Sequence, residues 1–143
     1  MRALGLDLGA RRIGVAISDG AGRVATPIAT LERASKRDRS ADHRAIAELV
    51  AEWEAEVVAV GLPLSLDGSI GPAAAAVLEE VAELAKVLAV PVETVDERFT
   101  TVTADQQLKA SGVRGRDRTK IIDQAAAAVL LQAWLDRQET ERC

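Results

Sequence analysis

The sequence predicts an α/β fold with a five-stranded mixed sheet, in which an antiparallel meander of three strands precedes two parallel strands and helices flank the sheet. Apolar and β-branched runs separated by short turns fill residues 3–31, as a meander requires. Two further predicted strands, the almost wholly apolar run at 56–62 and the segment at 91–97, alternate with segments of helical spacing. Right-handed crossovers would bring both of these runs beside the first strand and parallel to it.

The meander is predicted from three short runs. Residues 3–8 (ALGLDL) and 12–18 (RIGVAIS) predict two strands, and the short turn between them implies antiparallel pairing. A turn dipeptide, Asp-Gly, precedes a third predicted strand at 23–31 (RVATPIATL). Pro27 has no N–H to donate, so we expect this strand to lie at an edge of the sheet or to contain a bulge.

The helices follow from apolar spacing and from capping residues. Ile46, Leu49, Val50 and Trp53 form one apolar stripe, which predicts a helix over 42–54. Proline is favoured in the first turn of a helix, as Pro72 would be. The remaining predicted elements are a strand at 56–62, a helix at 72–89, a strand at 91–97, a helix at 100–110 with Thr100 or Thr101 as N-cap, and a helix at 119–138.

Length and composition are those of one globular domain, which we expect to span residues 1–143. Hydrophobic residues make up 48% of the chain and charged residues 28%. Cys143 is the only cysteine, so no internal disulfide is possible. The chain opens without a signal-peptide pattern and has no apolar stretch approaching the roughly 18 residues of a membrane span. We therefore expect a cytoplasmic protein with no membrane partner.

Composition and charge indicate that any nucleic-acid binding occurs mainly through the phosphate backbone and shape. Net charge is −4 and aromatic residues are 2%, so base stacking has few platforms. Acidic residues gather in predicted helices, as at Glu79, Glu80 and Glu83, where a solvated face is the default interpretation. Basic residues crowd two segments, one with Arg33, Lys36, Arg37, Arg39 and Arg44, the other with Arg114, Arg116, Arg118 and Lys120.

Carboxylates occupy places where the pattern asks for apolar side chains. Asp7 lies within the first strand, on the face of Ala3 and Gly5, and could simply cap the following turn. Asp96 and Glu97 end the fifth strand, where ligands gather in α/β sheets, although pairing with Arg98 would also explain them.

Asp123 projects from the stripe of Ala127, Leu130 and Trp134 near the start of the last helix. It either forms hydrogen bonds with the surrounding structure or faces a cation. Converging carboxylates repel one another unless a cation neutralises them, and Mg²⁺ or Mn²⁺ is suited to such oxygen ligands. Two ions about 4 Å apart can activate water and stabilise the leaving oxygen in phosphodiester cleavage. The sole histidine, His43, is expected to be solvated at a helix start rather than catalytic.

Four blocks of the chain resemble the YqgF/RuvX family of pre-ribosomal RNA nucleases, which are related to Holliday junction resolvases. They are LGLDLGARRIGVAISD at 4–19, VGLPLSLDGS at 60–69, VDERFTT at 95–101 and TKIIDQAAAAVLL at 119–131. The resemblance covers essentially the whole chain and implies an RNase H-like fold. Departures are small: Arg11-Arg12 replaces a common Lys-Arg, and Ser65 replaces a usual Asn.

The resemblance also implies roles for single residues. Asp7, Glu97 and Asp123 would be the catalytic metal ligands, with Asp96 as the alternative, and the metal would be Mg²⁺ or Mn²⁺, two ions with substrate bound. The implied activity is trimming of the 5′ end of precursor 16S rRNA, with ribosomal particles as further partners. The nucleic-acid-binding residues would be Arg11, Arg12, Arg98, Arg114, Arg116, Arg118 and Lys120.

Three alternatives stay open at this point. A four-way DNA junction resolvase would share the fold and ordinarily act as a homodimer. A non-catalytic RNA-binding assembly factor could keep the fold without the chemistry. An actin-like phosphotransferase also opens with an Asp-Gly strand-turn-strand but needs two such subdomains. The sequence does not distinguish a monomer from a homodimer.

Overall fold

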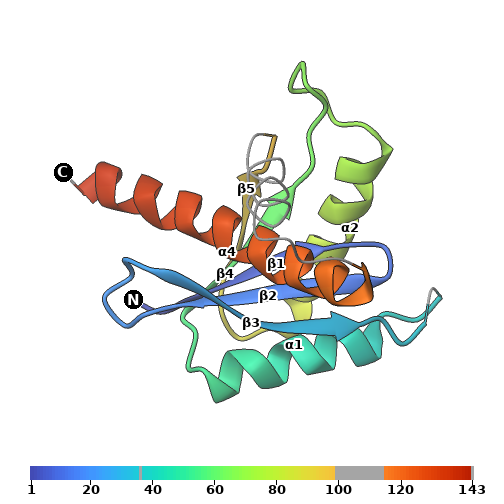
Figure 1. The fold of residues 1–143 in the computed structure, drawn as a ribbon, viewed down its shortest axis with the longest axis horizontal. Coiled ribbons are helices and arrows are strands. Elements are labelled where there is room, and N and C mark those ends of the chain that lie inside the picture. Colours follow the sequence, from blue (N-terminus) through green and yellow to red (C-terminus); the bar gives the residue numbers. More distant parts are fainter. Residues whose placement is uncertain (36, 99–114, 143) are drawn as a thin grey trace.

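The computed structural model describes residues 1–35, 37–98 and 115–142, with the side chains of 115–122 and 140–142 outside that description. Its five strands form one sheet in the order β3-β2-β1-β4-β5 (Figure 1). The β1–β2 and β2–β3 pairs are antiparallel, whereas β1–β4 and β4–β5 are parallel, which confirms the predicted fold class. The elements are β1 (Ala3–Leu8), β2 (Arg12–Ser18), β3 (Ala25–Glu32), α1 (Ser40–Glu52), β4 (Val57–Leu62), α2 (Pro72–Val87), β5 (Val92–Asp96) and α4 (Gly115–Arg142).

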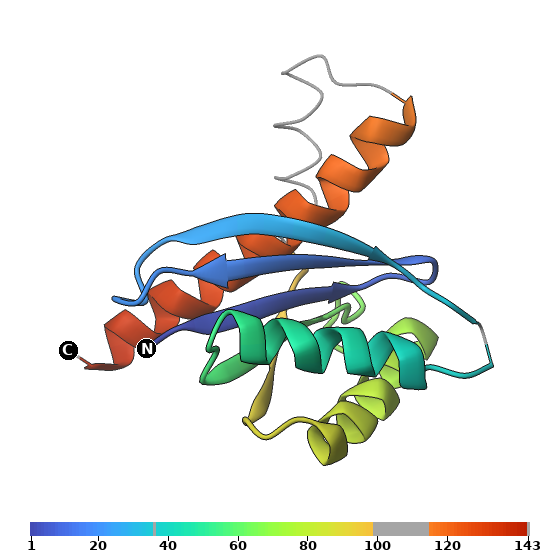
Figure 2. The same ribbon diagram turned by 90° about the horizontal axis from the view of Figure 1, so that it is seen from below.

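Helices cover both faces of the sheet. Figure 2 shows α4 on one side of the strands and α1 and α2 on the other. Leu4 and Leu6 of β1 pack with Ile46 of α1 and Leu84 of α2 in the larger apolar cluster. Ala3, Ala16 and Ala59 of the strands pack with Leu131 and Trp134 of α4 in the second cluster.

Small residues on the α4 side of the sheet let this helix lie close to the strands. A Cβ added to Gly5 would stand 2.7 Å from Leu131 Cβ, closer than side chains tolerate. Side chains alternate along β1, so Asp7 shares this small-residue face with Ala3 and Gly5, as predicted.

Two expectations about the strands have clear outcomes. β3 is an edge strand, and its pairing with β2 shifts register between Val15 and Ala16, beside Pro27, so both expectations for that proline are confirmed. β4 pairs with β1, but β5 pairs with β4 instead, so only one of the two later strands lies next to β1.

Element ends differ by a few residues from the predicted ones, with the largest difference in the last helix. α4 begins at Gly115 rather than at 119, which places Asp123 two turns inside the helix. The predicted helix at 100–110 lies outside the described residues. In the part of the chain that the structure describes, no helix combines the length and apolar character needed to cross a membrane.

Candidate nuclease site

Asp7 and Asp123 lie near each other because α4 packs directly against β1 and β2, where glycines leave room for the helix. Asp7 pairs with Gly14 across the β1–β2 ladder. A Cβ on Gly14 would overlap the carbonyl oxygen of Asp123, so the helix backbone rests directly on β2 at that point. The stripe of Ala127, Leu130 and Trp134 that follows Asp123 is buried, as predicted. The half-buried Asp123 is therefore held over the strand pair that carries Asp7.

Glu97 reaches the same side of the sheet from the end of β5. Its N–H donates to the carbonyl of Leu62 at 3.2 Å, which ties it to the end of β4. Its carboxylate lies over Gly61, where a Cβ would overlap Glu97 Oε2 and approach Leu130 of α4. The absence of a side chain at Gly61 thus leaves the space that the Glu97 carboxylate fills.

The three carboxyl groups share a desolvated, negatively charged environment. Burial, followed by the charge of Asp123, raises the pKa of Asp7 from 3.8 to about 6. Burial, followed by the charges of Asp7 and Asp96, raises the pKa of Glu97 from 4.5 to about 7. Burial also raises the pKa of Asp123, against the opposing charge of Arg12. Burial therefore makes each group costly to ionise, and neighbouring carboxylates add to that cost at Asp7 and Glu97.

Asp96 has a different environment from Glu97. Arg98 Nη2 lies 2.6 Å from Asp96 Oδ2, and the Arg98 backbone N–H donates to Asp96 Oδ1 at 3.1 Å. These hydrogen bonds, chiefly from the Arg98 side chain, lower the pKa of Asp96. The expected alternative pairing of Asp96 with Arg98 is thus present, and it leaves Glu97 as the carboxylate that interacts with Asp7.

The donor set has the chemistry of a divalent-cation site. All three groups are carboxylates, which hard cations such as Mg²⁺ prefer; burial raises the pKa of each, like charges add to the shift at Asp7 and Glu97, and a bound cation would offset both effects. Within residues 1–35, 37–98 and 115–142, no three acidic, histidine or cysteine side chains already stand close enough together to hold a metal. The residues therefore fit a cation by chemistry and charge, with side-chain movement required to enclose it.

The predicted nucleic-acid-binding residues differ in position and in how far the structure describes them. Arg11 is exposed in the turn after β1, and the partly exposed Arg12 begins β2; the charge of Arg12 acts on Asp123. Arg98 pairs with Asp96 and also reaches the carbonyl of Leu66 at 3.4 Å. Arg114 lies outside the described residues. Three further basic residues lie in the first turns of α4, and their side chains are not described: Arg116, Arg118 and Lys120.

Sequence reasoning missed a buried polar cluster on the opposite face. His43 and Glu80 are 4% and 2% exposed, so the expectation that both are solvated is wrong. His43 Nε2 lies 2.9 Å from Glu80 Oε2, and Arg33 forms a bidentate pair with the same carboxylate. The sequence carried a signal, because Glu80 falls on the α2 stripe of Val77 and Leu84.

Comparison with known proteins finds relatives that match most of the chain. The family model described as "RuvX: Holliday junction resolvase" matches residues 1–137. A Streptomyces coelicolor protein named "Putative pre-16S rRNA nuclease" is 51% identical over 96% of this chain and 81% of its own length. A protein of the same name from Mycobacterium ulcerans is 48% identical over 97% of this chain and 81% of its own length.

Solved structures show the same fold at lower identity. The structure of Thermus thermophilus RuvC in complex with a Holliday junction substrate superposes with a TM-score of 0.57 at 18% identity, covering 98% of both chains. The structure of T. thermophilus RuvC described without that substrate gives a TM-score of 0.53. The likeness confirms the RNase H-like architecture and, together with the family match over nearly the whole sequence, shows that this chain belongs to the RuvX family.

Proposed function

We propose that this protein is a divalent-metal-dependent nuclease that hydrolyses phosphodiester bonds at the 5′ end of precursor 16S rRNA. The observation that carries the proposal is the placement of Asp7, Glu97 and Asp123 on one side of the sheet, with the pKa values of all three raised. The names of the relatives supply the RNA substrate.

The three carboxylates would hold Mg²⁺ or Mn²⁺, with two ions present when substrate is bound. Bound metal supplies an activated water and charge stabilisation for the leaving oxygen. Asp7 of β1 and Glu97 at the end of β5 lie on either side of β4 in one sheet, and α4 adds Asp123 on the same face. Asp96 stays paired with Arg98, so we assign the ligand role at the end of β5 to Glu97; Asp96, the alternative that the sequence offered, would become a ligand only if that ion pair opened.

The surrounding cations would position the phosphate backbone. Arg11 lies in the turn after β1 and Arg12 begins β2, and their contacts would be salt-sensitive and independent of sequence. Arg98, Arg114, Arg116, Arg118 and Lys120 complete the proposed nucleic-acid-binding set. We place this activity in one domain, residues 1–143, acting in the cytoplasm on RNA or on ribosomal particles, as a monomer or homodimer.

A second candidate function is resolution of four-way DNA junctions, which the family description favours. Parallel assays on precursor 16S rRNA and on a four-way DNA junction separate the two candidates. Asp7→Asn tests the site and Asp96→Asn is the matched control, since the Asp96 carboxylate is already engaged by Arg98.

We expect metal-dependent cleavage of the RNA by the wild type and by Asp96→Asn, and none by Asp7→Asn. Cleavage that persists in excess chelator contradicts the metal mechanism. Cleavage confined to the junction would overturn the RNA assignment in favour of the second candidate.

A further inference from the structure

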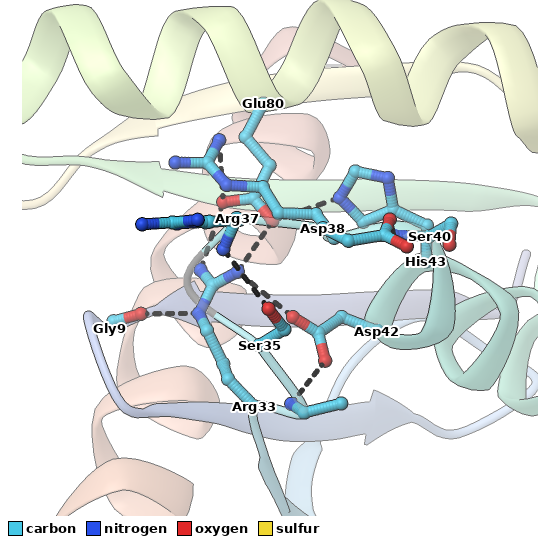
Figure 3. Close-up of polar contacts among 11 residues, drawn as sticks. Gly9, Arg33, Ser35, Arg37, Asp38, Ser40, Asp42, His43 and Glu80 are labelled. Carbon is cyan, nitrogen blue, oxygen red and sulfur yellow. Dashed lines mark hydrogen bonds and ion pairs between the residues drawn. The ribbon is translucent and has the colours of Figure 1, made fainter.

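A buried ion-pair cluster lies beneath the turn that joins β1 to β2 (Figure 3). Its centre is Arg33, one residue beyond β3, whose side chain is only 10% exposed. Arg33 Nη1 and Nη2 donate to Glu80 of α2 at 2.8 and 2.9 Å. His43 and Asp42 of α1 contact the same groups, with His43 Nε2 at 2.9 Å from Glu80 and Asp42 Oδ2 at 3.4 Å from Arg33.

Arg33 also contacts the β1–β2 turn on both of its sides. Its Nε donates to the carbonyl of Gly9 at 2.8 Å, and its backbone N–H donates to the carbonyl of Arg11 at 2.9 Å. One residue therefore fixes both limbs of the turn while its guanidinium is anchored to α2.

The β1–β2 turn is tightly closed, so a displacement of one of its residues moves the neighbouring residues as well. The N–H of Gly9 contacts the carbonyls of Asp7 at 3.1 Å and Arg12 at 2.9 Å, which closes the turn tightly. A Cβ at Gly9 would lie 2.7 Å from the Arg12 carbonyl oxygen. Displacement of the Gly9 carbonyl would therefore be passed to Asp7 on one side and to Arg12 on the other.

The anchor suits this task because a guanidinium presents five donors in one plane. Arg33 uses them toward Gly9, Glu80 and Asp42 at once. A lysine ammonium is a compact point charge and cannot span these directions. The pair is also well shielded, since the Glu80 and Asp42 side chains are each 3% exposed.

We propose that Arg33, anchored by Glu80, is a positioning residue for the hydrolysis, because it holds the turn that places Asp7 and Arg12. The inference rests on the proposed function for its catalytic consequence. Arg33 lies on the face of the sheet covered by α1 and α2, so it acts through the turn and does not touch the reacting atoms.

The test compares Arg33→Lys with Arg2→Lys. Arg2 is a matched control because it too donates to a backbone carbonyl, that of Trp53 at 3.0 Å, at the opposite end of β1. The readouts are kcat and KM on precursor 16S rRNA at saturating Mn²⁺, and hydrogen exchange of the Gly9 amide in metal-free protein.

For Arg33→Lys we expect kcat to fall by about 10- to 100-fold with KM within about twofold, since small misplacements of catalytic groups act on the chemical step. The Gly9 amide should exchange about tenfold faster, as the turn opens more often. Arg2→Lys should change neither quantity.

Unchanged kcat and unchanged Gly9 exchange in Arg33→Lys overturn the inference. If Arg33→Lys does not fold, Glu80→Gln must show the same fall in kcat and the same faster exchange of the Gly9 amide. Wild-type values of both quantities in Glu80→Gln would likewise overturn the inference. A core variant, Val50→Ala, shows whether general destabilisation alone reproduces the pattern, which would also refute positioning. A wild type that cleaves no RNA refutes the proposed function, whereas an active wild type with unaffected Arg33 variants refutes this inference alone.

Discussion

Replacing Gly14 by alanine should force α4 away from the sheet. The added Cβ would overlap the carbonyl oxygen of Asp123, with the Asp123 Cα 3.3 Å away, so the obstacle is helix backbone. Overpacking of this kind typically costs about 1–3 kcal/mol, and a backbone obstacle places Gly14→Ala near the upper limit. At about 3–4 °C per kcal/mol for a chain of this size, Tm should fall by about 10 °C.

The matched control is Gly20→Ala, which makes the same chemical change in open space. Nothing lies within 4 Å of a Cβ at Gly20, and its φ is not positive. A surface substitution of this type should change stability by no more than about 0.5 kcal/mol.

Thermal unfolding followed by circular dichroism measures both variants, and Mn²⁺-dependent cleavage reports on the displaced Asp123. A Gly14→Ala protein that melts within about 2 °C of wild type would show that α4 does not rest on β2 at Asp123, and the site geometry would fail with it.

Three further predictions concern charge. Asp7→Asn should stabilise the metal-free protein by up to about 3 kcal/mol above pH 6. Folding raises the pKa of Asp7 from 3.8 to about 6, so the free-energy penalty on its charged form grows as pH rises through that window. Urea unfolding at pH 4 and pH 7.5 measures the difference, and a loss of stability at pH 7.5 would contradict the reasoning. Glu80→Gln should make the free energy of unfolding fall less steeply in acid. The pKa of Glu80 is lowered in the folded protein, so the stability that its charged form contributes is present above about pH 4.5 and is lost as pH falls through the folded-state pKa. Equal slopes of unfolding free energy against pH for the wild type and the variant, measured by urea unfolding, would refute this. Asp96→Asn should cost no more than about 1 kcal/mol, since both partners of its ion pair with Arg98 are partly exposed; calorimetry showing a loss of several kcal/mol would contradict it.

Local patterning was sufficient for the elements and for the faces of β1. Alternation along ALGLDL separated Leu4 and Leu6 from Asp7, and the missing N–H of Pro27 indicated an edge strand with a bulge. Helical spacing placed Asp123 on the buried stripe of α4. These features depend on residues within a few positions of one another, which is why sequence alone could predict them.

Contacts between distant residues could not be predicted in the same way. Glu80 looked solvated because its cation, Arg33, lies 47 residues earlier in the chain and reaches it only in the folded protein. The close approaches at Gly14 and Gly61 likewise require the path of α4 and the position of Glu97. The roles of Asp7, Glu97 and Asp123 as ligands stay predictions, supported by their shared electrostatic environment.

Isothermal titration calorimetry with Mn²⁺ shows whether Asp7, Glu97 and Asp123 together form a metal site. The variants are Asp7→Asn, Glu97→Gln and Asp123→Asn, with Asp96→Asn as the control. Each of the three substitutions should weaken Mn²⁺ affinity by about tenfold or more, because each removes a charged oxygen ligand, whereas Asp96→Asn should bind Mn²⁺ as the wild type does. Wild-type affinity in all three variants would contradict a metal site at these carboxylates.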